Sequence, residues 1–114
     1  MVAILRAILL TASVLAGECG QVGHACEVQV ARTMANRAAA GERGILSAYY
    51  ARAPITSESA MAATLLVLRP GLLADRLYYF VWSDADRVEW GWPEGDKVLC
   101  SEQCIHLGRE WPGG

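Results

Sequence analysis

The 114 residues carry ten Lys and Arg against twelve Asp and Glu, for a formal net charge of -2, and 54% of them are apolar. This length and apolar content predict a single domain, residues 1–114, with one continuous core. The basic residues are spread along the chain, so nothing in the composition provides the electrostatic surface that nucleic acid requires.

The first element is an apolar segment over residues 2–16, interrupted only by Arg6, Thr11 and Ser13. Its periodicity predicts a helix that is apolar nearly all round, and therefore central and buried. About 15 apolar residues are too few to span a bilayer comfortably, so we expect no stable membrane span. Residues 14–16 would also pass as a signal-peptidase site, which leaves a cleaved export signal as the alternative.

Glycines at positions 17, 20 and 23 end this pattern, so Glu18 is expected where the first helix stops and the chain turns. Good helix formers over residues 26–40 predict an amphipathic second helix, which Gly41 ends. A short third helix is expected over residues 45–51, before Pro54.

Residues 56–59 offer several N-cap side chains before an apolar helix at 60–68, which Pro70 closes. A brief helical turn is expected at 72–74. The aromatic and branched run at 77–82 predicts a strand, and shorter strands are expected near 97–99 and 105–107. The fold class is therefore α+β and mainly α, with a small antiparallel sheet in the C-terminal third.

The four cysteines form two local pairs, Cys19 with Cys26 and Cys100 with Cys104. Two short-range disulfides are the leading interpretation in so small a chain. Zinc bound by these thiols with His24 or His106, or free buried thiols, are the alternatives. Because neither pair has the CxxC spacing typical of structural zinc, we expect no metal.

Glu18 is the strongest candidate for chemistry. Glycoside cleavage needs a carboxylic acid that stays protonated near neutral pH, and burial beside apolar groups achieves this. Val14 and Leu15 lie one helical turn before Glu18 in an almost uncharged segment. A solvated Glu in a glycine-rich turn is the alternative interpretation.

The segment 15–20, which contains Glu18, and the segment 30–37, which ends in Asn36-Arg37, resemble the SleB-type family of spore-cortex-lytic enzymes and cell wall hydrolases. In that family an apolar helix ends in a Glu-Ala type motif, and the next helix carries a Val-Ala signature running into Asn-Arg. The resemblance covers nearly the whole chain from about residue 4, which favours a domain helix over a cleaved signal.

Later segments resemble the family more weakly. Residues 62–71 are similar to its later helix and turn, Asp75 with 78–80 to a strand entered through Asp and aromatic residues, and 105–107 to its terminal histidine-containing strand. The chain departs from the family at Gln21, near which a second acidic residue is common, and at Arg76-Leu77, where a glycine-alanine step is usual.

The resemblance implies a lysozyme-like helical domain that cleaves the bond between N-acetylmuramic acid and N-acetylglucosamine, with Glu18 as general acid and base. A hydrolase normally uses two carboxylates, whereas a lytic transglycosylase can use one. Since Gln21 stands near the place of the second acid, the one-carboxylate reaction is favoured. Asp75 is the remaining candidate for a supporting carboxylate, with turn capping as its alternative.

Asn36 and Arg37 are expected to support the site, Asn36 by hydrogen-bonding the loop that carries Glu18. Their alternative roles are those of residues at a helix C-terminus. The residues expected to contact substrate are polar or aromatic, because aromatic faces bind the apolar faces of sugar rings: Gln29, Tyr78, Tyr79 and His106. The tryptophans are left undecided, and His106 has a structural hydrogen-bonding role as its alternative.

The expected partner is therefore the peptidoglycan glycan strand, without a cofactor. The chain could reach the cell wall by export or by bacteriophage delivery, including as part of a virion or a larger lytic assembly. Three other functions stay open: a noncatalytic glycan-binding or phage virion module of the same fold, a small secreted disulfide-linked protein, and a metal-binding regulator.

Overall fold

The computed structural model describes residues 2–19, 24–42, 52–98 and 104–112. Four helices come first: α1 (Val2–Cys19), α2 (His24–Ala39), α3 (Ser57–Leu68) and the short α4 (Pro70–Leu73). They are followed by β1 (Phe80–Ser83), α5 (Asp84–Trp90), β2 (Asp96–Val98) and β3 (Ile105–Gly108). The predicted class, α+β and mainly α with a small antiparallel sheet near the C-terminus, is confirmed.

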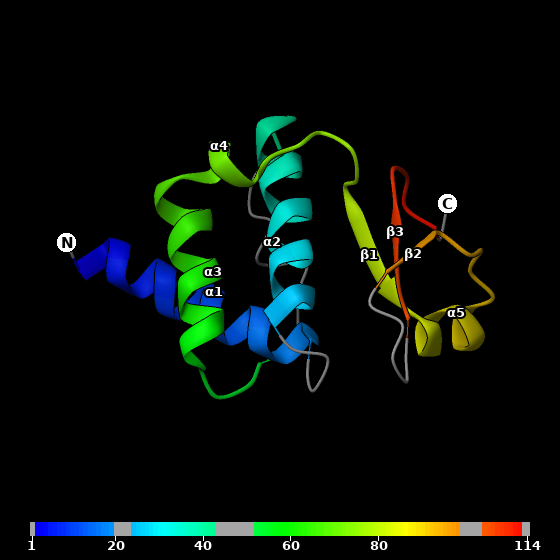
Figure 1. The fold of residues 1–114 in the computed structure, drawn as a ribbon, viewed down its shortest axis with the longest axis horizontal. Coiled ribbons are helices and arrows are strands. Elements are labelled where there is room, and N and C mark those ends of the chain that lie inside the picture. Colours follow the sequence, from blue (N-terminus) through cyan, green and yellow to red (C-terminus); the bar gives the residue numbers. More distant parts are fainter. Residues whose placement is uncertain (1, 20–23, 43–51, 99–103, 113–114) are drawn as a thin grey trace.

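The helices and the sheet lie side by side, with α2 between the α1 and α3 pair and strand β1 (Figure 1). The core extends across both parts, because Val30 and Met34 of α2 pack with Leu15 of α1 and with Ile105 of β3. Helix α2 is therefore the element to which the other parts of the fold are attached.

The sheet has three antiparallel strands in the order β1-β3-β2. Trp82 of β1 lies opposite His106 of the central strand, and Lys97 of β2 lies opposite His106 on the other side. Gly95 and Gly108 flank the Trp82 ring so closely that a Cβ on Gly108 would lie 2.5 Å from it. These glycines leave the room that the indole needs within the sheet.

The start of α3 has the cap that its sequence predicts. Thr56 Oγ1 accepts from the backbone N–H of Ser59 at 3.0 Å, and Ser59 Oγ accepts from the N–H of Thr56 at 3.0 Å. This reciprocal pair satisfies two backbone donors that a helix start would otherwise leave open. Helix α3 consequently begins three residues before the apolar run at 60–68.

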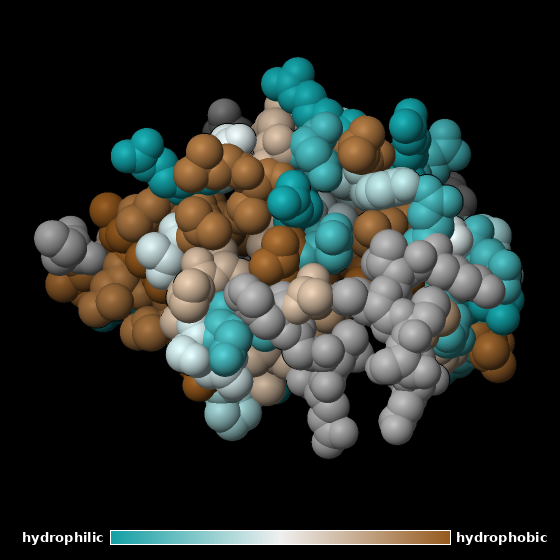
Figure 2. Space-filling model, viewed as in Figure 1, coloured by the Kyte–Doolittle hydropathy of each residue, from teal (hydrophilic) through white to brown (hydrophobic). Residues whose placement is uncertain are grey.

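Helix α1 is buried only in its second half, so the expectation of a helix covered on all sides is wrong. Val14 and Leu15 are fully buried, whereas Val2 is 65% and Leu5 54% exposed. Figure 2 shows apolar surface gathered over the N-terminal end of α1 and over α3. Helix α1 is long and apolar enough to cross a membrane, a property that core helices and signal sequences share.

Two other expectations differ from the structure or fall outside it. Helix α5 was not expected, and the strand predicted at 77–82 is formed only from Phe80. The third helix predicted over 45–51 lies outside the described residues.

Candidate active site

Glu18 lies in the last turn of α1, where the predicted disulfide between Cys19 and Cys26 joins this helix to the start of α2. Cys19 and Cys26 are both buried, whereas Glu18 is exposed. The expected burial of Glu18 among apolar groups is therefore wrong. The disulfide fixes the backbone on which Glu18 stands.

The second predicted pair is described only in part. Cys104 is disulfide-bonded, while Cys100 lies outside the described residues. The backbone N–H of Cys104 donates to Asp84 Oδ2 at 3.0 Å, and its carbonyl accepts from the N–H of Asp84 at 3.3 Å. These two bonds hold the start of β3 against the start of α5.

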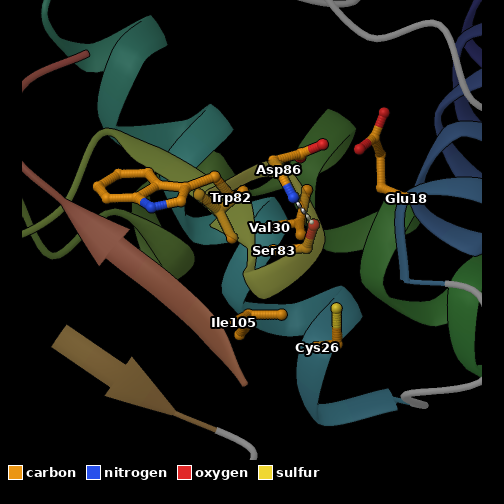
Figure 3. A pocket seen from close by; sticks show the side chains of 8 residues that line it. Glu18, Cys26, Val30, Trp82, Ser83, Asp86 and Ile105 are labelled. Carbon is orange, nitrogen blue, oxygen red and sulfur yellow. Dashed lines mark hydrogen bonds between the residues drawn. The ribbon is translucent and has the colours of Figure 1, made fainter. Parts of the chain in front are cut away.

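Glu18 lines a pocket of about 100 Å³ that five elements build (Figure 3). Its other lining residues come from α2, β1, α5 and β3: Cys26, Val30, Val81, Trp82, Ser83, Asp86 and Ile105. Most of this lining is apolar or aromatic, and the polar groups are concentrated at Glu18, Ser83 and Asp86. Glu18 and Asp86, on two different helices, thus line one small concave site.

Asp86 is positioned by the first turn of α5. Ser83, the N-cap, accepts from the backbone N–H of Asp86 at 3.1 Å, which fixes where the helix begins. In Figure 3 the Asp86 carboxyl group points toward the side of the pocket that carries Glu18. The sequence interpretation missed this second carboxylate, although a Ser three residues before an Asp is a recognisable helix start.

Trp82 contributes to the pocket lining from β1, but its indole lies on the other face of the sheet from Val81 and Ser83 and points away from Glu18 (Figure 3). The indole is 5% exposed and donates through Nε1 to the carbonyl of Pro93 at 3.2 Å. It stacks on His106 with ring centroids 6.1 Å apart and planes inclined by 8°. These contacts hold the Trp82 ring on the face of the sheet opposite to that of Val81 and Ser83.

His106 has a structural environment. It is fully buried, its Nδ1 accepts from the N–H of Gly95 at 3.2 Å, and its Nε2 lies 2.5 Å from Asp84 Oδ1. The hydrogen bond from His106, followed by the one from the backbone of Cys104, lowers the pKa of Asp84. His106 was expected to contact substrate. Instead its ring stacks on Trp82, and His106 is absent from the described pocket lining.

Asn36 orders the loop before β1. It is 1% exposed; its Nδ2 donates to Asp75 Oδ1 at 2.8 Å and to the carbonyl of Tyr78 at 2.6 Å. Its Oδ1 accepts from the backbone N–H groups of Asp75 and Arg76, both at 2.8 Å. The expectation that Asn36 holds the Glu18 loop is wrong, since Cys26 and Asn36 lie about 15 Å apart along α2 at ~1.5 Å per residue.

Asp75 caps the same turn. Its Oδ1 accepts from the N–H of Leu77 at 3.1 Å, and Arg32 Nη1 lies 3.7 Å from Oδ2. Burial raises the pKa of Asp75, but the hydrogen bonds from Asn36 and Leu77, with the Arg32 charge, outweigh it and leave the pKa below its usual value. Of the two roles considered for Asp75, the structure places it in the turn-capping one.

Arg37, in the last turn of α2, contacts a residue that follows the helix and a residue of β1. It donates to both carboxylate oxygens of Glu42, at 2.8 and 2.5 Å, and its guanidinium lies 5.0 Å above the Phe80 ring. The hydrogen bond from Arg37 lowers the pKa of Glu42. These contacts tie the end of α2 to the start of β1.

The remaining predicted substrate contacts also lie away from the pocket. The Tyr78 hydroxyl donates to the Asp96 carboxylate, which raises the pKa of Tyr78, and the Tyr79 N–H donates to the carbonyl of Gly108 at 3.0 Å. Gln29 is half-buried on α2. The described pocket lining includes none of the three. Of the predicted site residues, the structure thus brings Glu18 and Cys26 together.

Within residues 2–19, 24–42, 52–98 and 104–112, no group of three or more His, Cys, Asp or Glu side chains could hold a metal ion. No protein-family model, curated protein or solved structure matches the chain. The pocket and the residues around Glu18 are therefore the features of this protein that bear on its function.

Proposed function

We propose that this protein cleaves the glycan strand of peptidoglycan, with Glu18 as general acid and base. The observation that supports the proposal is the pairing of Glu18 with Asp86 in the lining of one pocket. Paired carboxylates flanking a scissile bond are the usual equipment of glycosidases. The SleB-type resemblance around Glu18 and Asn36 points to peptidoglycan among the possible glycans.

In the proposed reaction, Glu18 donates its proton to the glycosidic oxygen as the bond from that oxygen to C1 breaks, and the bonding electrons stay on the oxygen. The Asp86 carboxylate stabilises the positive charge that develops on the sugar ring. Glu18, now a carboxylate, removes a proton from the hydroxyl group that attacks C1. If that hydroxyl belongs to water the reaction is hydrolysis; if it is the sugar's own 6-hydroxyl, an anhydro sugar forms.

The exposure of Glu18 suits a polymer that lies across the surface. The pocket, at about 100 Å³, is smaller than the ~300–1,000 Å³ typical of sites that enclose a whole ligand. One sugar substituent fits inside, and the rest of the strand would cover the Glu18 carboxyl from outside. That covering removes water from the carboxyl group and favours its neutral, proton-donating form.

The test is digestion of purified peptidoglycan, followed by mass spectrometry of the released muropeptides. Wild type, Glu18→Gln and Asp86→Asn would be compared with Glu58→Gln, an exposed position on α3 whose contact with Ser57 a glutamine can keep. We expect release by wild type and Glu58→Gln and none above background by Glu18→Gln. Anhydromuramyl ends would identify transglycosylation, and reducing ends would identify hydrolysis.

A folded wild-type protein that releases nothing from several peptidoglycans would contradict the enzymatic proposal. Sedimentation with the same peptidoglycan would then show whether the protein still binds it. Retained binding without release would identify the noncatalytic glycan-binding module that the sequence left open.

A further inference from the structure

Three of the four tryptophans gather beyond the pocket, at the end of α5 and near the C-terminus. Trp92 contacts Trp111 edge to face, with centroids 5.2 Å apart, and stacks with Trp90 at 6.4 Å. Trp111 also meets Phe80 edge to face at 5.6 Å. We call Trp90, Trp92 and Trp111 the tryptophan cluster.

The tryptophan cluster is a surface feature. Trp90 is 62% and Trp111 51% exposed, and no member belongs to the hydrophobic core. Trp82, in contrast, is buried, and its N–H is bonded. Tryptophan side chains left this open to water leave a large flat apolar area for a ligand.

Helix α5 connects this surface to the pocket. Asp86 and Trp90 are four residues apart on α5, so they lie on neighbouring positions of one helix face, about 6 Å apart along its axis at ~1.5 Å per residue. Asp86 lines the pocket. A strand leaving the pocket along this face of α5 would therefore pass onto the tryptophan cluster.

We infer that the tryptophan cluster binds the sugar residues of a glycan strand that extends out of the Glu18 pocket, an inference that rests on the proposed function. The indole faces of Trp90 and Trp111 would stack against the apolar faces of pyranose rings. The exposed charges beside Trp111 are of both signs, Arg109 and Glu110. They offer hydrogen bonds to hydroxyl and amide groups without the net positive charge that a phosphate polymer would favour.

The side chains of the tryptophan cluster favour a glycan over a lipid as its ligand. The large exposed apolar surface at the opposite end of the protein is aliphatic and is formed by residues such as Leu5, Leu9 and Leu72. The tryptophan cluster instead combines flat aromatic rings with flanking polar groups, which is the combination a sugar ring needs. The small pocket also requires an adjoining surface to hold the rest of the strand.

The experiment measures glycan affinity in a protein that cannot cleave. In the Glu18→Gln background, Trp90→Ala and Trp111→Ala would be titrated with a soluble N-acetylglucosamine oligomer and sedimented with peptidoglycan. Val88→Ala is the matched control, because Val88 is 76% exposed on the same helix. We expect each tryptophan variant to bind about 3- to 10-fold more weakly, and the control to bind as the parent does.

Unchanged affinity in both folded tryptophan variants would overturn the inference, as would binding of the parent to phosphatidylglycerol vesicles in place of the glycan. Near-ultraviolet circular dichroism would establish that each variant is folded, and Trp90→Phe, which keeps an aromatic face, should restore most of the affinity. Wild type that binds through the cluster but releases no muropeptide would contradict the proposed cleavage and leave the binding inference standing. The two failures are therefore distinguishable.

Discussion

Asn36 and Asp75 are joined by two hydrogen bonds, one from the Asn36 amide to the Asp75 carboxylate and one from the Asp75 backbone to the Asn36 carbonyl oxygen, both 2.8 Å long. Because Asn36 is buried, both ends of its amide are committed to the loop that leads into β1. This pair connects the end of α2 to the loop that precedes β1. It therefore helps to position β1, the strand that contains Trp82.

Asn36→Ala should therefore be strongly destabilising. The substitution leaves the backbone donors of Asp75 and Arg76 without their acceptor and removes the two bonds that the buried amide donates, for an expected loss of about 3 kcal/mol in the free energy of unfolding. Urea unfolding followed by circular dichroism measures it. Ala38→Ser, at an exposed position in the same turn of α2, should cost no more than about 0.5 kcal/mol; equal losses in both variants would contradict the role assigned to Asn36.

Asp75 should make stability depend on acid pH. Its pKa is lowered in the folded state, so the unfolded chain takes up the proton first. The stabilisation is therefore complete above the unfolded value, about pH 4, and is lost as the pH falls through the lower folded value. Unfolding of wild type and Asp75→Asn at pH 7, 5, 4 and 3 should show a difference that is constant down to pH 5 and shrinks below pH 4. A stability difference between wild type and Asp75→Asn that grows as the pH falls would contradict a lowered pKa of Asp75 in the folded state.

The Cys19–Cys26 disulfide should stabilise both the fold and the site. Loss of so short a cross-link, in the Cys19→Ser and Cys26→Ser double variant, is expected to cost about 2–3 kcal/mol. Since Glu18 precedes Cys19, glycan cleavage should also fall at temperatures where the variant is still folded. A variant that loses stability but keeps full activity would show that the disulfide does not position Glu18.

Gly108→Ala tests the support of Trp82. A Cβ there would lie 2.5 and 2.7 Å from two atoms of the indole ring, so we expect a loss of about 1–3 kcal/mol in the free energy of unfolding and a displacement of Trp82, a residue of the pocket lining. Thermal unfolding and glycan affinity measure the two effects. Gly71→Ala in α4 is the control, because a Cβ there meets nothing within 4 Å. Equal behaviour of the two variants would contradict the close packing around Trp82.

The second carboxylate can be tested by itself. If Asp86 stabilises the developing charge, Asp86→Asn should lower kcat at least about tenfold with a smaller effect on KM. Steady-state release of muropeptides measures both. Glu89→Gln, on the same helix at an exposed position outside the described pocket lining, should leave kcat unchanged. An Asp86→Asn enzyme with wild-type kcat would leave Glu18 as the only acting carboxylate.

Local patterns predicted most of the helices, because their signals lie within a few residues. The capping side chains before α3 mark its start, and the glycines around Cys19 mark the end of α1. The amphipathic run over α2 predicts the helix itself. The close spacing of Cys19 and Cys26 likewise predicted their bond. Helix α5 was missed because its seven residues are too few to show a periodicity, although Ser83 marks its start.

The site was harder to predict because its contacts are long-range. Nothing near Asn36 in the sequence says that its partners are Asp75 and Tyr78, and the helical face of Asn36 suggested the loop of Glu18 instead. The apolar pattern of α1 likewise does not reveal that most residues of its first half are exposed. Asp86 reaches the pocket only because β1 and α5 return to the Glu18 end of α2.

The proposed mechanism depends on Glu18 moving the proton in glycan cleavage. Its most direct test is the initial rate of muropeptide release by Glu18→Gln, measured beside the binding of the same variant to the same peptidoglycan. We predict that the rate falls at least about 100-fold while binding is kept within a factor of about three, because the acid is lost but the pocket and the strand surface remain. A Glu18→Gln protein that releases muropeptides at the wild-type rate would contradict the account.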